Sequence, residues 1–209
     1  MKLKKKVKRI ILLLLFIAVV IVGFLIYQNH SKKDEVKEVK VINQIEKYGY
    51  SLKENKPAKY KKMFEELKEI LEAETVDEEK YVSKISEMFV YDFYSLKDKT
   101  SKTDIGGVEF VYSGILENFL ENAQDTYYKY IENNIYNDRK QNLPVVTDIK
   151  VESVEQKEFT YGDRNDSSAY HVKVTWDYTD NDSFHNYQKE AELVFIHEDE
   201  KLHLVELQK

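Results

Sequence analysis

Hydrophobic positions near the amino terminus form one unbroken block. Eighteen residues, Ile10 to Tyr27, contain no charged side chain. At about 1.5 Å of rise per residue a helix over this block is roughly 27 Å long, close to the about 30 Å apolar core of a bilayer. The pattern therefore predicts a transmembrane helix over residues 10–27.

Other interpretations of this block compete with a retained membrane helix. A cleaved signal peptide has a shorter apolar stretch and a small-residue cleavage site, whereas this block ends in Gly23-Phe24-Leu25-Ile26-Tyr27. A buried helix of a soluble domain usually has a polar face, which the block lacks. The chain has no cysteine that could carry a lipid. The residues favour a helix that stays in the membrane.

The pattern changes after a polar stretch over residues 28–38, which we expect to act as a tether. Weak alternation then predicts a strand within residues 39–52. Asn55-Lys56-Pro57 predicts the start of a first helix, because proline is well tolerated in the first turn.

Two further helices are predicted from apolar residues that recur every three or four positions. One begins near Thr75-Val76-Asp77-Glu78, where Thr75 and Glu78 match a capping box. The other is long and runs from about Phe110 to Asn133. On that helix we expect the Tyr128 side chain to be exposed, and exposed tyrosines are common at protein interfaces.

The periodicity switches from helical to alternating after Pro144, which predicts strands. Helices followed by a meander of strands indicate an α+β fold, with about three helices packed on a curved antiparallel sheet of four or five strands. The predicted strands begin near Val145 and run over Tyr170–Tyr178, Gln188–His197 and Lys201–Leu207.

Charge gives the orientation of the chain. The whole chain carries −6 and residues 1–9 carry +6, so residues 10–209 carry −12. Cations stay on the cytoplasmic side of a membrane helix, which predicts a cytoplasmic basic tail over residues 1–9 and an exported domain over residues 39–209 at the plasma membrane.

An acidic domain is a poor partner for nucleic acid. Only three of the 32 basic residues are arginine, and this lysine bias suggests a bacterium of low genomic G+C content.

The order of these elements resembles the membrane-anchored NTF2-like domains, in particular the VirB8-type components of bacterial secretion and conjugation machines. The resemblance implies a cone in which helices and a curved sheet enclose an apolar pocket. It assigns to that pocket six aromatic residues: Phe89, Phe93, Phe119, Tyr170, Trp176 and Tyr178. The same spacing is also what a packed core would show.

Asp92 is the candidate for chemistry. It is the only charged residue between Met88 and Tyr94. A carboxyl group in an apolar pocket has a raised pKa and can act as a general acid or base, and the resemblance implies an aspartate with this role in the cone. The alternative is that Asp92 is solvated or pairs with Arg139 or a lysine.

The rest of the sequence contains no motif for a metal, phosphate or cofactor site. No histidine pair has the helical spacing of a zinc site, no glycine-rich phosphate loop is present, and we expect neither a metal nor a cofactor. The leading hypothesis is a non-enzymatic protein-binding or scaffold domain in a bacterial envelope or transport complex. The sequence is also compatible with a homo-oligomer. The alternatives are a small-ligand-binding or sensing pocket, and an enzyme that uses Asp92.

Overall fold

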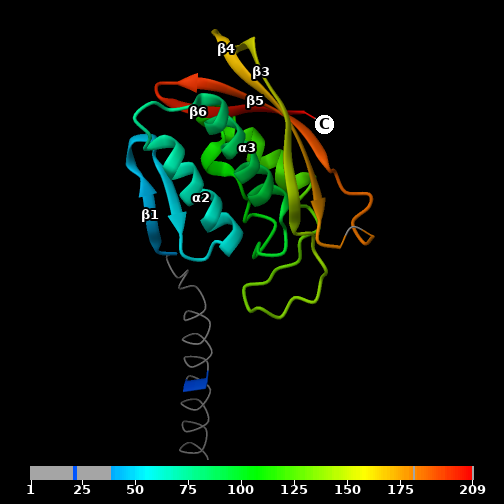
Figure 1. Ribbon diagram of the computed structural model, residues 1–209. Coiled ribbons are helices and arrows are strands. Elements are labelled where there is room, and N and C mark those ends of the chain that lie inside the picture. Colours follow the sequence, from blue (N-terminus) through cyan, green and yellow to red (C-terminus); the bar gives the residue numbers. More distant parts are fainter. Residues whose placement is uncertain (1–20, 23–38, 181, 209) are drawn as a thin grey trace, which may run out of the picture. The chain divides into compact units, whose positions relative to one another are not determined.

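The computed structural model of the protein describes residues 21–22, 39–180 and 182–208. Residues Val41–Lys209 form one compact unit. The described part of this unit contains three α-helices and a curved four-stranded antiparallel sheet (Figure 1). The predicted α+β class is confirmed.

The predicted membrane segment lies almost entirely outside the described residues. Of residues 10–27, only Ile21 and Val22 are described, and both are helical. No helix within the described ranges is long and apolar enough to span a bilayer. The basic tail over residues 1–9 and the tether over residues 28–38 also lie outside these ranges.

The stretch predicted as a single strand, residues 39–52, forms a hairpin instead. β1 (Val41–Ile45) and β2 (Tyr50–Lys53) pair antiparallel in a two-stranded sheet of their own. The 3-10 turn η1 (Glu46–Tyr48) connects them, and Gly49 follows it with a φ of +66°. Glycine adopts this left-handed conformation without steric cost, and the chain reverses there although alternation continues on both sides.

The first two predicted helices are present as α2 (Ala58–Leu71) and α3 (Glu78–Tyr94). Pro57 directly precedes α2, as expected. The predicted cap of α3 is wrong by two residues. The carboxylate of Asp77, not the hydroxyl of Thr75, accepts the Lys80 N–H (3.1 Å) at the helix start.

The prediction of one long helix from Phe110 to Asn133 is wrong. The chain forms two 3-10 turns, η2 (Val108–Phe110) and η3 (Ser113–Ile115), followed by the short helix α4 (Leu116–Asp125).

Tertiary contacts at both ends explain why the helical pattern is interrupted. Between η2 and η3, Val111 forms a parallel bridge with Leu204, and the Tyr112 N–H donates to the Leu204 carbonyl (2.8 Å). This pairing needs extended backbone. At the other end α4 stops at Thr126, and the following turn directs Tyr128 inward.

Tyr128 is fully buried, in contrast to the exposed position predicted for it. Its hydroxyl accepts the Gly106 N–H (3.1 Å) and donates to the Phe93 carbonyl (2.6 Å). Tyr130, two residues later, has the exposed position, with 78% of its surface accessible. Tyr128 therefore joins the loop before α4 to the end of α3.

Four strands in chain order make the main sheet, and its order β3-β4-β5-β6 leaves β3 and β6 at the edges. Its first two strands are longer than predicted and meet at Gly162 in a tight hairpin. The two-residue turn Asp199-Glu200 joins the last two. The strands are β3 (Val146–Tyr161), β4 (Arg164–Tyr178), β5 (Glu190–Glu198) and β6 (Lys201–Gln208).

Helix α3 lies between α2 and the sheet and forms the centre of the core (Figure 1). Nearly every residue of its second half is buried. Its carboxyl end is tied to the start of β3, because the Ser95 hydroxyl accepts the Val146 N–H (3.0 Å) and the Leu96 N–H donates to the Pro144 carbonyl (2.9 Å). Side chains near the end of α3 are thus held from several directions.

Replacing Tyr128 with phenylalanine tests the inward turn after α4. We expect Tyr128→Phe to lower the free energy of unfolding by about 2 kcal/mol, because the Gly106 N–H and Phe93 carbonyl lose a buried partner. Urea unfolding of the full chain in detergent, followed by circular dichroism, measures this change. Tyr130→Phe is the matched control and should have no measurable effect. Equal effects of the two variants would contradict the assigned role of Tyr128.

Candidate functional site

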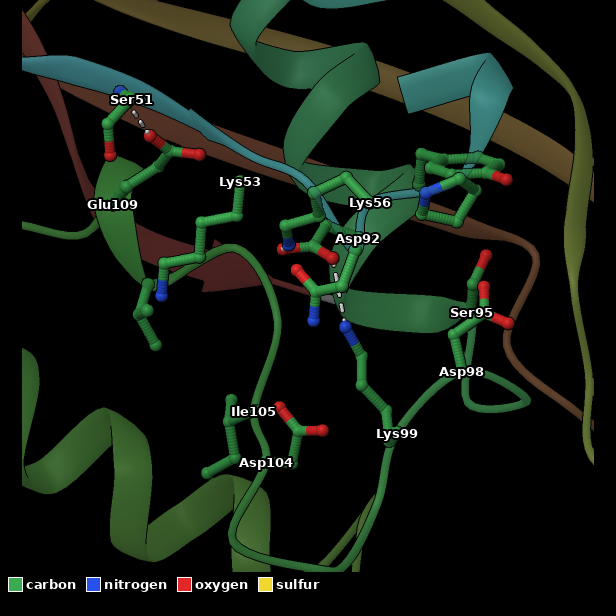
Figure 2. Close-up of a pocket in the computed structure, with 14 residues that line it drawn as sticks. Ser51, Lys53, Lys56, Asp92, Ser95, Asp98, Lys99, Asp104, Ile105 and Glu109 are labelled. Atoms are coloured by element: carbon green, nitrogen blue, oxygen red, sulfur yellow. Dashed lines mark hydrogen bonds and ion pairs between the residues drawn. The ribbon is translucent and has the colours of Figure 1, made fainter. Parts of the chain in front are cut away.

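Asp92 lies on α3 at the centre of a buried ion-pair cluster (Figure 2). Its Oδ2 accepts from Lys56 Nζ (2.6 Å) and from the Gly107 N–H (2.8 Å), while its Oδ1 accepts from Lys99 Nζ (2.9 Å). Asp92 and Lys99 are only 7% and 6% exposed. Both carboxylate oxygens therefore accept hydrogen bonds from the protein.

Two segments of the chain bring these three donors to Asp92. Lys56 precedes α2, Lys99 lies on the loop after α3, and Gly107 ends that loop. The loop approaches so closely that a Cβ on Gly106 would lie 2.0 Å from the Asp92 carbonyl oxygen. Gly107 has a φ of +73°, and a Cβ there would lie 2.6 Å from the Phe89 ring. Only adjacent glycines fit against the helix at this point.

The electrostatics of the cluster keep Asp92 ionised. Burial by itself raises the pKa of a carboxyl group, but the charges and hydrogen bonds of Lys99 and Lys56 outweigh burial and hold the pKa of Asp92 well below its usual range. A general acid near neutral pH needs the opposite shift. Arg139, the other partner considered for Asp92, donates instead to the carbonyls of Lys97 and Lys99.

A second carboxylate lies near this cluster. Glu109 Oε1 accepts from the Tyr60 hydroxyl (2.5 Å), and Lys56 Nζ lies 4.7 Å from the centre of the Tyr60 ring. Burial raises the pKa of Glu109, although the hydrogen bond from Tyr60 and the charge of Lys56 oppose the rise. Lys56 thus lies between a low-pKa and a raised-pKa carboxyl group.

The cleft around these groups has a volume of about 230 Å³. Charged side chains of both signs line it, and the best-buried of them pair with one another. The arrangement fastens the loop after α3 to the helix, and we assign the cluster a structural role. The charged lining residues are Lys53, Lys56, Asp92, Asp98, Lys99, Asp104 and Glu109.

A larger and more apolar cavity of about 650 Å³ lies between α4 and β6, and we call it the α4–β6 groove. Buried residues from α3 and α4 form its floor, and partly exposed side chains of α4 and β6 form its walls. Amides, hydroxyl groups and one carboxylate supply its polar groups. The lining residues are Phe93, Tyr94, Ile115, Asn118, Phe119, Asn122, Ala123, Thr126, Tyr127, Gln188, Val205, Glu206 and Leu207.

Helix α4 supplies one wall because its groove-facing residues recur with helical spacing. Ile115, just before the helix, Phe119 and Ala123 are four residues apart, and Asn118 and Asn122 lie beside them. The Phe119 ring packs against Phe93 of α3 with centroids 5.3 Å apart. The groove is thus a continuation of the aromatic core that is open to solvent.

The structure distributes the six predicted pocket residues over three places. Phe93 and Phe119 line the groove, and Phe89 stacks behind Phe93 with centroids 5.3 Å apart. Trp176 and Tyr178 are buried next to the groove. The Trp176 and Tyr94 ring centroids are 4.4 Å apart, and the Tyr178 hydroxyl forms a hydrogen bond with the Tyr127 hydroxyl (3.1 Å).

Tyr170 lies apart from the other five, near the start of α3. Its hydroxyl donates to Glu78 Oε2 (2.9 Å), and its ring lies 5.6 Å from that of His197.

Within the described ranges no three histidine, aspartate or glutamate side chains are grouped to hold a metal ion.

The sequence analysis allowed a lysine partner for Asp92 but did not identify Lys56 or Lys99, and it missed one wall of the groove. Lys56 and Lys99 are two among many lysines, and only the Gly106-Gly107 pair marked the place where the loop meets the helix. The strand over residues 201–207 was predicted, but nothing in its pattern indicated that residues 205–207 face an open cavity.

No protein-family model, curated protein or solved structure matches this chain.

Replacing Asp92 with asparagine tests the buried cluster. We expect Asp92→Asn to lower the free energy of unfolding at pH 7 by about 3 kcal/mol, because Lys99 and Lys56 lose the charge that compensates their burial. Urea unfolding of the full chain in detergent measures the loss. Asp98→Asn is the matched control in the same cleft, and as an exposed residue it should change stability by less than about 0.5 kcal/mol.

The pH dependence of this loss has a definite sign. The pKa of Asp92 is lower in the folded chain than the unfolded value of about 3.9, so its stabilisation is complete well above pH 4 and is lost as the pH falls further. The difference between wild type and Asp92→Asn should therefore shrink between pH 6 and pH 3. A difference that stays constant or grows on acidification would show that Asp92 is not held as a carboxylate.

Proposed function

We propose that the protein is a single-pass, membrane-anchored extracytoplasmic protein whose domain binds another protein without catalysing a reaction, as a scaffold in a bacterial envelope or transport complex. The observation that carries the proposal is the α4–β6 groove, an open, aromatic-lined cavity on the acidic domain. Aromatic residues at an open surface favour protein recognition, because they provide large contact areas.

The proposed membrane location rests on the sequence. The apolar block over residues 10–27 has the length of a bilayer core, and the six cations before it favour a cytoplasmic amino terminus. The domain then lies on the outer side of the plasma membrane, and its partner is to be sought there.

The proposed fold family is the NTF2-like cone of VirB8-type proteins. Three helices that precede a curved four-stranded antiparallel meander support this assignment. In such a family a groove beside the sheet is a reasonable place for a partner, although fold by itself does not determine function.

A small-ligand-binding or sensing role is the second candidate. The groove volume of about 650 Å³ lies within the range of small-molecule pockets, about 300–1,000 Å³. Asn118, Asn122 and Gln188 could orient such a ligand through their amides. An enzyme based on Asp92 is less well supported, because two lysines and a backbone N–H already occupy its carboxylate.

Protease accessibility tests the proposed topology. In cells that express the full chain, we expect the protein to stay in the membrane fraction after a high-salt wash. Protease added outside intact spheroplasts should degrade the domain over residues 39–209. A protein released into the medium would indicate a cleaved signal peptide, and a protected domain would contradict the proposed orientation.

Site-specific photocrosslinking in cells tests the binding role. A photoreactive phenylalanine analogue that replaces Asn122, an exposed residue of the groove, should give a crosslinked species of discrete mass that contains a second protein. The matched control replaces Lys150, an exposed residue on β3, and should give no such species. If neither position captures a protein, and a small molecule co-purifies with the full chain, the second candidate replaces the first.

A further inference from the structure

The α4–β6 groove has the edge of the main sheet as one of its walls. β6 pairs with β5 on one side and is the outermost strand on the other. Val111 bridges that outer side only at Leu204, where the Tyr112 N–H is bound. Among the described residues no strand pairs with the outer side of β6 beyond Leu204, and residues 205–207 line the groove there.

We propose that the groove binds an extended segment of another protein, which adds to the sheet as a strand beside β6 and carries basic side chains next to apolar ones. The inference rests on the proposed protein-binding function and specifies its partner. A sheet edge presents backbone N–H and C=O groups without a neighbouring strand. An extended segment satisfies them while alternate side chains enter a pocket.

The opposite edge of the sheet differs in a way that supports this assignment. β3 has six charged residues in its sixteen positions. Charged side chains along an edge strand discourage the addition of a further strand. In the groove segment of β6, residues 205–208, only Glu206 is charged.

One irregularity of β6 itself helps to open the groove. Leu204 pairs with Phe195 and Glu206 pairs with Val194, so Val205 is left out of the ladder with β5. A bulge of this kind turns the strand and redirects a side chain. Val205 is one of the groove-lining residues.

The groove offers space and chemistry for an apolar side chain of the added strand. Phe93 and Ala123 form a buried floor, and the half-buried Phe119 ring forms the wall opposite β6. Asn118 and Asn122 at the rim can bond the backbone of the segment on the side away from β6.

Charge specifies the rest of the partner. Among the described residues that line the groove, Glu206 is the only charged one. The outer face of α4 adds Glu117, Glu121 and Asp125, all exposed, and α4 contains no basic residue. Negative charge on and near the groove attracts basic side chains. The same charge disfavours a second copy of this acidic chain as the partner.

Selection from a peptide library tests the inference without knowledge of the natural partner. A library of random nine-residue peptides is panned against the full chain in detergent. We expect the selected peptides to alternate in character, with Lys or Arg next to large apolar residues, and to lose at least about tenfold in affinity when alternate backbone amides are N-methylated, because methylation removes the donors that pair with an edge strand.

A pair of matched variants locates the site. Glu206→Lys should weaken the selected peptide at least about tenfold, whereas Glu158→Lys on the exposed edge strand β3 should change its affinity less than about twofold. Circular dichroism of both variants checks folding, and the N-methylated peptide tests strand addition on the unaltered protein.

The failures of the two proposals are distinguishable. No enrichment, acidic peptides, tolerance of N-methylation or equal effects of the two variants would overturn strand addition, as would a crosslink from position 122 to a second copy of this chain. If position 122 still captures a different protein, the binding function survives and only its mode is wrong. If it captures no protein at all, the proposed function itself fails.

Discussion

The carboxylate of Asp92 is the fixed point on which the arrangement of this domain depends. It joins two pieces of chain that are distant in sequence: Lys56, shortly before α2, and the loop after α3, which supplies Lys99 and the Gly107 N–H. Once the loop is held against α3, Gly106 reaches the Tyr128 hydroxyl. Tyr128 then directs the chain after α4 inward, and α4 is placed beside β6 with the groove between them. Asp92, which first suggested catalysis, therefore has a structural role in holding this loop.

This role explains why a buried charge is kept in an otherwise aromatic helix. Replacement of a buried ion pair with apolar residues is often neutral or stabilising, so such pairs are weak evidence for stability. Here the ion pairs of Asp92 also determine where the loop after α3 lies. Apolar side chains could hold this loop near α3 but would not fix its position along the helix. The hydrogen bond from Gly107 to Asp92 (2.8 Å) selects one position of the loop backbone.

Sequence patterns predicted the parts of this fold that depend on regular repetition. The class, α2, α3 and the order of the four strands follow from the spacing of apolar residues, which reports the face that each element buries. The errors have a different origin. The helix from Phe110 to Asn133 is interrupted because Val111 pairs with Leu204, a residue more than ninety positions away in the chain. The hairpin over residues 39–52 depends on one glycine conformation. Neither leaves a periodic signal. For the same reason the sequence indicated Asp92 as an isolated charge with a lysine as a candidate partner, but it did not indicate which lysines pair with it or that the groove is open, because these contacts form only in the folded chain.

The packing beside the groove has a spectroscopic consequence. The chain has a single tryptophan, Trp176, which is 3% exposed and packs on the Tyr94 ring at 4.4 Å. Tyr94 also forms part of the groove floor. One aromatic ring therefore separates the indole from whatever occupies the groove, and a displacement of Tyr94 alters the environment of the indole. The protein carries its own optical reporter, whose emission responds to the state of this surface without an added label.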